Sequence, residues 1–236
     1  MHFKIITLFS QLFPGALSAS ITGAALEKKL WSFEAINIRN YAKDKHQTVD
    51  DAPYGGGAGM LLKADILGDA IDANNCKKII YLSPRGKVFN QKKAQELALE
   101  KEITILCGRY EGVDSRVLDE YEIEEISIGD YVLSGGEIAA QVLIDAVLRN
   151  IDGVLGADES LNEESFGAKN NDEYQNLLEY PHYTRPALWK GRGIPEILTS
   201  GHHKNIEKWR KEEAIKVTQK NRPDLYKKFI ESENKF

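Results

Sequence analysis

Short apolar runs of β-strand composition alternate with longer stretches of helical composition through the first 150 residues. Strands are predicted by the runs at 3–9, 33–38, 78–82, 103–107 and 123–128. Helices are predicted at 90–99, where Asn90 suits the N-cap position, and at 137–149, where Ile138, Val142, Ile144 and Leu148 could form an apolar stripe. Strands that alternate with helices are typical of an α/β fold with a mostly parallel sheet.

The periodicity stops after Gly156. The segment that follows is acidic, rich in Asn, Glu and Ser and poor in large apolar residues, which is typical of a mobile linker. Prolines interrupt the rest of the chain, but residues 206–219 have a helical composition. We therefore predict an α/β domain over 1–155, a flexible acidic linker over 156–173 and a small helical domain over 174–236.

Composition excludes several classes of protein. With 236 residues, 42% hydrophobic and 28% charged, the chain can bury a sizeable core, and it has no apolar run long enough to span a bilayer. The first nine residues alternate like a strand and do not resemble a secretion signal. We expect a cytoplasmic protein.

The two cysteines, Cys76 and Cys107, occur in no Cys-x-x-Cys or Cys/His spacing. This argues against a disulfide framework and against a structural zinc site.

The net charge of -5 conceals an asymmetry along the chain. Lys+Arg and Asp+Glu number 17 and 22 over residues 1–155, 1 and 6 over 156–173, and 13 and 8 over 174–236. The basic terminal segment also carries aromatic and imidazole side chains, among them His182, His202, His203, Trp189 and Trp209. It is a candidate surface for phosphates and bases, although a solvated helical face would have a similar composition.

Three glycine-bearing loops, at 83–86, 108–112 and 129–136, follow predicted strands. In a parallel sheet such loops share one edge, where ligands bind, and glycine leaves the backbone amides accessible. Glycine also marks ordinary turns, but three such loops together favour a pocket. The dinucleotide-binding motif Gly-x-Gly-x-x-Gly does not occur, because the glycines at 55–59 have a different spacing. A phosphate-binding P-loop does not occur either, because no Lys directly follows these glycines. A ligand held by backbone groups with little fixed charge, such as a nucleoside sulfonium, would suit this site.

Several longer segments have a recognisable sequence. They are Thr-Val-Asp-Asp-Ala-Pro-Tyr-Gly-Gly-Gly at 48–57, Tyr-Leu-Ser-Pro at 81–84, Cys-Gly-Arg-Tyr-Glu-Gly at 107–112, Ser-Ile-Gly-Asp-Tyr-Val-Leu-Ser-Gly-Gly-Glu at 127–137 and Tyr-Pro-His-Tyr-Thr-Arg-Pro at 180–186. Together they resemble the bacterial tRNA (guanine(37)-N1)-methyltransferases of the SPOUT family, in register over nearly the whole chain. The resemblance implies an α/β sheet domain with a C-terminal trefoil knot, a small helical C-terminal domain, a homodimer and tRNA as partner, with no role for DNA or a membrane. The spacing itself does not indicate a knot, because threaded chains are rare.

The resemblance also implies that S-adenosylmethionine binds to main-chain groups of the three loops. The matching positions are Tyr81, Leu82, Ser83, Pro84, Gly108, Tyr110, Glu111, Ser127, Ile128, Gly129, Asp130, Tyr131, Val132, Leu133, Gly135 and Gly136. Glu111 could line the cofactor or attract Mg²⁺, which the family uses in catalysis.

For catalysis, the resemblance implies a general base at Glu164 assisted by Arg149. Guanine N1 must lose its proton before methylation, and negative charge then builds on O6, so a carboxylate and a cation are the groups required. The family has Asp where this chain has Glu164, and a displacement of about 1 Å can cost about 10²-fold in rate. The neighbouring Glu163 is the alternative base.

His182, Tyr183 and Arg185 match the motif that opens the family's RNA-binding domain, where phosphate contacts set affinity and an unstacked base is read at its edges. Three other interpretations remain open. They are a methyltransferase of the same fold that acts on another RNA position, an RNA-binding protein without catalysis, and a nucleotide-dependent enzyme using the 55–59 loop, which lacks the necessary lysine.

Overall fold

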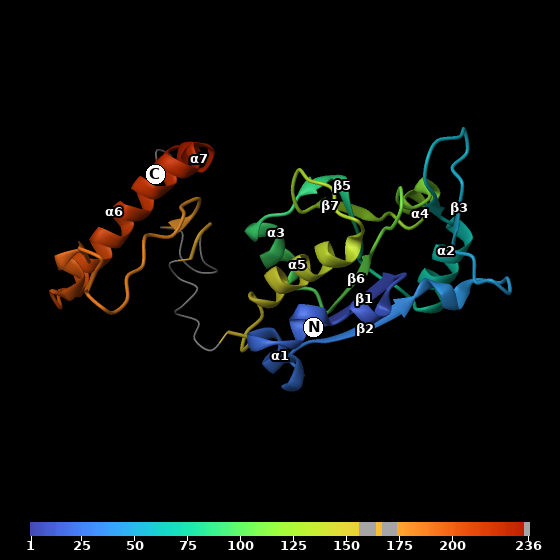
Figure 1. The fold of residues 1–236 in the computed structure, drawn as a ribbon, viewed down its shortest axis with the longest axis horizontal. Coiled ribbons are helices and arrows are strands. Elements are labelled where there is room, and N and C mark those ends of the chain that lie inside the picture. Colours follow the sequence, from blue (N-terminus) through green and yellow to red (C-terminus); the bar gives the residue numbers. More distant parts are fainter. Residues whose placement is uncertain (156–163, 167–173, 234–236) are drawn as a thin grey trace. The chain divides into compact units, whose positions relative to one another are not determined.

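The structure is a computed structural model that describes residues 1–155, 164–166 and 174–233 (Figure 1). Contacts between residues divide the chain into two compact units, Met1–Gly156 and Ala157–Phe236. In the described residues, no helix combines the length and the apolar composition that crossing a membrane requires.

The first unit contains a five-stranded sheet with the order β2-β1-β6-β5-β7. Its strands are β1 (His2–Thr7), β2 (Ser32–Asn37), β5 (Ile79–Val88), β6 (Glu102–Leu106) and β7 (Glu124–Ser127). Every neighbouring pair is parallel, which confirms the predicted α/β class with a mostly parallel sheet.

The predicted loop at 83–86 proves to be an interruption inside β5. Leu82 and Lys87 both pair with Ile126 of β7, so the residues between them bulge out of the ladder. Pro84 lies in this bulge, where its missing N–H costs no ladder hydrogen bond. The strand resumes after the bulge and ends at Val88.

Helices cover both faces of the sheet. They are α1 (Ser20–Glu27), α2 (Ala64–Ala73), α3 (Gln91–Leu97), α4 (Ser115–Glu120) and α5 (Gly136–Leu148), with short 3₁₀ helices η1 (Ser10–Leu12), η2 (Gly15–Ser18) and η3 (Ile38–Tyr41) and a small ladder of β3 (Asp50–Asp51) with β4 (Leu61–Leu62). Successive strand residues point to opposite faces. Ile5 therefore belongs to the core cluster under α1, α3 and α5, and Ile6 to the cluster under α2 and α4.

Two predictions about helix detail had different outcomes. The side chain of Asn90 accepts a hydrogen bond from Lys93 N (2.9 Å), which confirms it as an N-cap. The predicted stripe on α5 was wrong, because Ile144 and Leu148 are buried while Ile138 and Val142 are 58% and 46% exposed. The helix turns by about 100° per residue, which places these two pairs about 120° apart around its axis.

The second unit is small and mostly helical. It contains β8 (Leu188–Trp189), β9 (Arg192–Gly193), η6 (Glu196–Thr199), α6 (His203–Asn221) and α7 (Pro223–Glu233), and α6 includes the helix predicted at 206–219. Its buried core consists of Tyr174, Leu177, Tyr180, Ala214 and Phe229.

Two short segments are tied to this unit by hydrogen bonds. The buried Thr218 hydroxyl donates to Ala214 O (2.7 Å) and accepts from Leu178 N (2.8 Å), which joins the segment before the hairpin to α6. Ser165 Oγ accepts from Glu179 N (2.9 Å), and Phe166 N donates to Leu177 O (2.7 Å). The remainder of the predicted linker, 156–163 and 167–173, lies outside the described residues.

Candidate cofactor pocket

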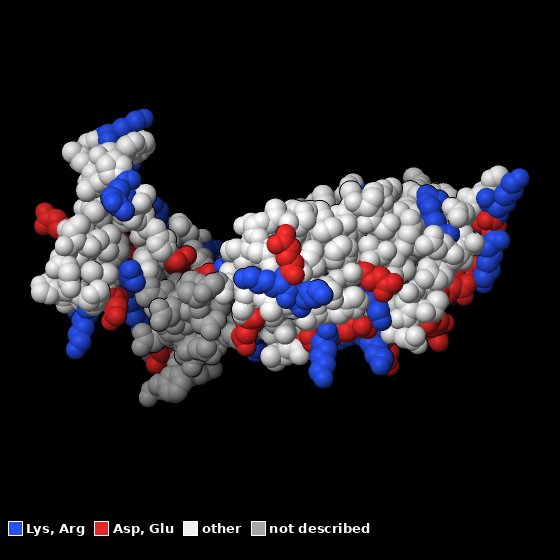
Figure 2. Space-filling model, turned by 90° about the horizontal axis from the view of Figure 1, so that it is seen from below, with Lys and Arg blue, Asp and Glu red and all other residues white. Residues whose placement is uncertain are grey.

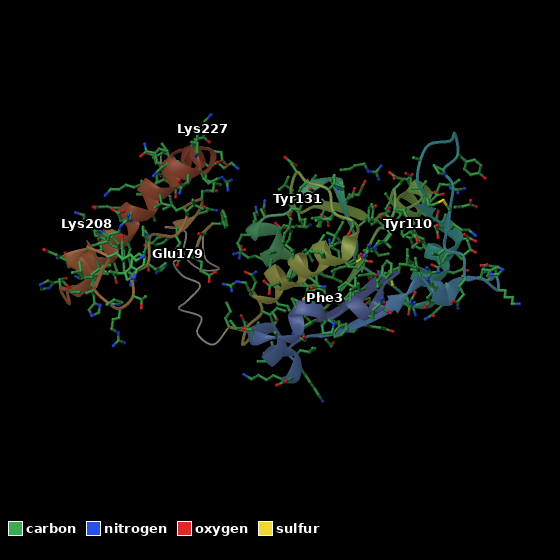
Figure 3. All side chains as sticks on the ribbon, in the orientation of Figure 1. Phe3, Tyr110, Tyr131, Glu179, Lys208 and Lys227 are labelled. Carbon is green, nitrogen blue, oxygen red and sulfur yellow. The ribbon has the colours of Figure 1, made fainter. Side chains whose placement is uncertain are left out.

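A pocket lies where the β5 bulge, the loop after β6 and the loop after β7 converge. These segments occupy the carboxyl-terminal ends of neighbouring parallel strands, the position at which ligands bind in open α/β sheets. Figure 3 labels Tyr110 and Tyr131, which come from two of the three loops. The pocket encloses about 260 Å³, close to the lower end of the usual range for small-molecule sites, about 300–1,000 Å³.

The structure brings together all the residues that the sequence predicted for the cofactor, with one exception. Asp130 does not line the pocket, although its neighbours Gly129 and Tyr131 do. Four further residues line it that sequence reasoning did not select, namely Arg109, Gly112, Ile126 and Ala139. Glu137 lies just behind this lining, next to Gly136. The geometry thus assembles one cavity from three loops, and the binding of a cofactor in it stays a prediction.

Glycine allows two of these loops to touch backbone to backbone. Gly136 N donates a hydrogen bond to Gly108 O (2.9 Å), and a Cβ at Gly136 would lie 2.8 Å from Cys107 Cα. A Cβ at Gly108 would lie 2.8 Å from the Tyr81 hydroxyl. These glycines are therefore required for close approach, which a larger residue would prevent.

A buried charge pair joins the same two loops to the sheet. Glu137 is 1% exposed, and its Oε2 lies 2.9 Å from Arg109 Nε. These two atoms interact as charges without an aligned hydrogen bond. Glu137 Oε1 accepts a hydrogen bond from the Thr7 hydroxyl (2.8 Å), and Arg109 Nη1 donates to Ser134 O (3.1 Å). The Arg109 guanidinium also lies over the Phe9 ring, 4.4 Å from its centroid.

Sequence reasoning missed this network. Arg109 stands inside one recognisable segment and Glu137 at the end of another, but nothing in either segment indicates that their side chains pair. Thr7 ends β1, far away in the sequence. The one local signal was that a charged residue opens a helix that is otherwise apolar on its buried face. A buried carboxylate needs a cation or hydrogen-bond donors, and here it has both.

Two titratable side chains beside the pocket stay neutral at neutral pH. Burial raises the pKa of the Tyr81 phenol above its usual value, and the nearby Arg85 only partly offsets this effect. Burial likewise raises the pKa of the Cys107 thiol well above its usual value, with a further contribution from the charge of Glu137. Neither side chain is therefore suited to act as a base or a thiolate nucleophile.

Glu111 is the second charged side chain of the described lining besides Arg109. It also lines an adjoining cavity with Pro53, Tyr54 and Arg116, so its side chain stands between the two spaces. Among the described residues there is no group of three His, Cys, Asp or Glu side chains that could hold a metal ion. The predicted binding of Mg²⁺ at Glu111 thus gains no support from this geometry.

Arg149 is not among the residues that line the pocket. It follows the last residue of α5, a 13-residue helix, and stands about 15 Å along the helix axis from Ala139, the last residue of α5 in the lining. Glu164 belongs to the second unit. Glu163, the alternative base, lies outside the described residues.

The predicted RNA-binding residues His182, Tyr183 and Arg185 are exposed on the second unit. The His182 ring lies 4.8 Å from Tyr180, and its Nε2 is 2.8 Å from Glu179 Oε1. Tyr183 lies against Trp209 at a ring separation of 6.4 Å. Figure 2 shows lysine and arginine side chains projecting from this unit, at the left of the view. Aromatic rings and cations thus share its surface.

Comparison with known proteins gives a consistent result. Residues 1–228 match the model of the family described as tRNA (Guanine-1)-methyltransferase TrmD. Three similar proteins, each called tRNA (guanine-N(1)-)-methyltransferase, come from bacteria. The Rhodospirillum rubrum protein is 54% identical over 228 residues, which is 96% of this chain and 92% of the relative. The Wolbachia pipientis wMel protein is 51% identical, with 94% and 93% covered, and the Rhizobium etli protein 50% identical, with 98% and 97% covered.

Proposed function

The chain belongs to the tRNA (guanine-1)-methyltransferase family, and on this premise we propose that it transfers the methyl group of S-adenosylmethionine to N1 of guanine 37 in tRNA, beside the anticodon. One observation carries the proposal. Three glycine-bearing loops form a single pocket whose lining has few charged side chains and is rich in glycine. We also propose that this tRNA-modifying activity operates in the cytoplasm, and that the chain has the SPOUT fold with its trefoil knot.

The residues of the pocket fit S-adenosylmethionine. Leu82, Ile128 and Leu133 offer apolar side chains for the adenine ring, and the loop glycines leave backbone amides and carbonyls accessible for its polar edge and the ribose. The carboxylate of Glu111 can lie opposite the positive charge of the ligand. When bound, this cofactor supplies an electrophilic methyl group on a sulfonium.

The protein's own contribution to the reaction is proton removal and charge stabilisation. The Glu164 carboxylate accepts the proton from guanine N1, which frees an electron pair on N1. That pair would form the new bond to the methyl carbon as the bond between the methyl carbon and the sulfonium sulfur breaks, and the neutral thioether would be the leaving group. The Arg149 guanidinium stabilises the negative charge that develops on O6. A positioned base of this kind contributes about 10²- to 10⁴-fold to the rate.

We further propose that the enzyme works as a homodimer. In one chain the pocket lies at the start of α5 and Arg149 at its end, so a second copy would bring the Arg149 guanidinium to a guanine held at the pocket. The exposed Ile138 and Val142 on α5 give the helix an apolar face suited to such an interface.

The decisive experiment is methylation of tRNA transcripts with labelled S-adenosylmethionine. We expect labelling of a transcript with guanine at position 37 and none when adenine replaces it. Primer extension should stop at position 37, because a methyl group on N1 blocks the Watson–Crick edge. Equal labelling of both transcripts would reassign the activity to another RNA position. Absence of S-adenosylmethionine binding in calorimetry, with and without tRNA, would favour an RNA-binding protein without catalysis.

A further inference from the structure

The second unit carries a small, regular hairpin before its helices. Strands β8 and β9 pair antiparallel, with Leu188 opposite Gly193 and Trp189 opposite Arg192. The two residues between the strands, Lys190 and Gly191, have φ values of +50° and +76°. Positive φ at both central positions is the signature of a type I′ turn, whose twist matches that of the flanking strands. The hairpin thus holds its side chains in a defined arrangement.

Trp189, at the end of β8, is 59% exposed. Within the described residues the other two tryptophans are packed against apolar cores, Trp31 at 1% exposure and Trp209 against the core of the second unit. A Cβ at Gly193 would meet no atom within 4 Å, so open space surrounds this part of the hairpin. A large indole that remains in water forgoes the favourable free energy that burial of its apolar surface would provide, which suggests that a partner covers it.

The charges around Trp189 are all of one sign. Between Glu179 and Glu196 the sequence contains Arg185, Lys190 and Arg192 and no acidic residue. Lys190 Nζ lies 4.9 Å from the centroid of the Trp189 ring. Arg192 is directly opposite Trp189 in the ladder, and side chains at opposite positions project from the same face. An aromatic ring and two cations therefore stand together on a single exposed element.

We propose that the β8–β9 hairpin is a nucleotide-binding contact, at which an unpaired base of the tRNA other than the target guanine stacks on Trp189 while Lys190 and Arg192 contact the adjacent phosphates. Stacking on an aromatic ring inside a basic surface is the general mode by which proteins hold single-stranded nucleic acid. An apolar protein partner would leave these cations without counter-charges, whereas phosphates supply them. The inference rests on the proposed function for its RNA, but it concerns a surface that the methyl transfer itself does not use.

The test measures the affinity of the full-length protein for a tRNA transcript by fluorescence anisotropy. Trp189→Ala should weaken binding by about 5- to 150-fold, the range expected for the loss of one base–aromatic stack. Trp189→Phe should restore most of the affinity, because it retains an aromatic face. Leu188→Ala is the matched control, since Leu188 is 66% exposed on the same strand and cannot stack, and it should bind as the unaltered protein does. Arg192→Gln should reduce the slope of log K against log salt by about one.

Equal affinity of Trp189→Ala and unaltered protein for tRNA would overturn the proposal. A change in oligomeric state with Trp189→Ala, measured by sedimentation in the absence of RNA, would overturn it too, because the hairpin would then be a contact between proteins. The proposed function is tested separately by labelling of tRNA with the unaltered protein. If the hairpin proposal alone is wrong, Trp189→Ala binds tRNA normally while the unaltered protein still labels tRNA. If the unaltered protein neither binds nor labels tRNA, both proposals are wrong.

Discussion

The two units of this chain form their surfaces in opposite ways. The first unit sets its candidate site inside a folded framework, where glycine backbones touch and the carboxylate of Glu137 is buried. The described residues of the second unit form only a small buried core, and they display tryptophan, tyrosine and cations to solvent. A small cofactor of fixed shape is best held by a preformed cavity. A large charged RNA is best met by exposed rings and cations.

The charges of the two units differ in the same way. The Arg109 and Glu137 side chains are 20% and 1% exposed, so removal of one would leave the other poorly solvated. In the second unit, Lys208 and Glu212 on α6 form an ion pair with side chains that are 78% and 53% exposed, where water screens most of the attraction. Ion pairs thus have a structural role in the first unit and a solvating role on α6 of the second.

The largest expected effect is that of Glu164→Gln, which tests whether the second unit serves the reaction while the first unit binds the cofactor. We expect the rate of methyl transfer to fall by about 10²- to 10⁴-fold, because an amide cannot accept the guanine N1 proton. Affinity for S-adenosylmethionine should not change, since Glu164 is not among the described residues that line the pocket. Single-turnover methylation and calorimetry measure the two quantities. Glu163→Gln is the matched control, and a loss of rate in that variant alone would assign the base to Glu163.

A second test compares the two kinds of ion pair. Glu137→Gln retains a group that can accept from the Thr7 hydroxyl but leaves Arg109 without its counter-charge, so we expect the free energy of unfolding to fall by about 3–5 kcal/mol. Affinity for S-adenosylmethionine should fall as well, because Arg109 also holds the loop at Ser134. Urea denaturation and calorimetry provide both readouts. The control Glu212→Gln should leave both almost unchanged, and equal losses in the two variants would contradict the contrast between the units.

The smallest expected effect comes from adding one methyl group to a glycine in each unit. Gly136→Ala would force a Cβ to 2.8 Å from Cys107 Cα and 3.0 Å from Gly108 N, both backbone atoms, so we expect a loss of stability of about 1–3 kcal/mol and weaker cofactor binding. Gly193→Ala places its Cβ in open space and should not lower the melting temperature. Thermal unfolding with and without S-adenosylmethionine compares the two. Similar behaviour of both variants would show that the loops around Gly136 can move apart.

The sequence predicted the framework better than the contacts inside it. Apolar runs indicated all five strands of the sheet, and they are clearest in β1, β6 and the first half of β5, where consecutive residues are buried on both faces. Glycines placed after those strands indicated the loops of the pocket. The pairing of Arg109 with Glu137 could not be predicted, since it depends on how two loops meet in space and neither loop carries a local signal of it. The helix predicted at 137–149 already placed Arg149 at its end, and the structure agrees, since α5 ends at Leu148.

In the second unit, charge composition predicted a basic surface, but the hairpin was missed. Its strands have two residues each, too few to show the alternation that identifies a strand. Lys-Gly between Trp189 and Arg192 was the only local signal of a tight turn. The exposure of Trp189 depends on what the unit leaves uncovered, which no residue pattern in the hairpin reveals.

The hydrogen bonds of Ser165 and Phe166 to the segment at 177–179 have a consequence for how the activity can be divided genetically. They make the carboxylate of Glu164 part of the same folded body as the exposed rings and cations. A gene truncated at the boundary after Gly156 would encode the proposed cofactor pocket alone, because the proposed base and the proposed RNA surface would be deleted together. On the same proposals, exchange of the second unit between relatives would transfer substrate choice and proton acceptor as a single inherited module.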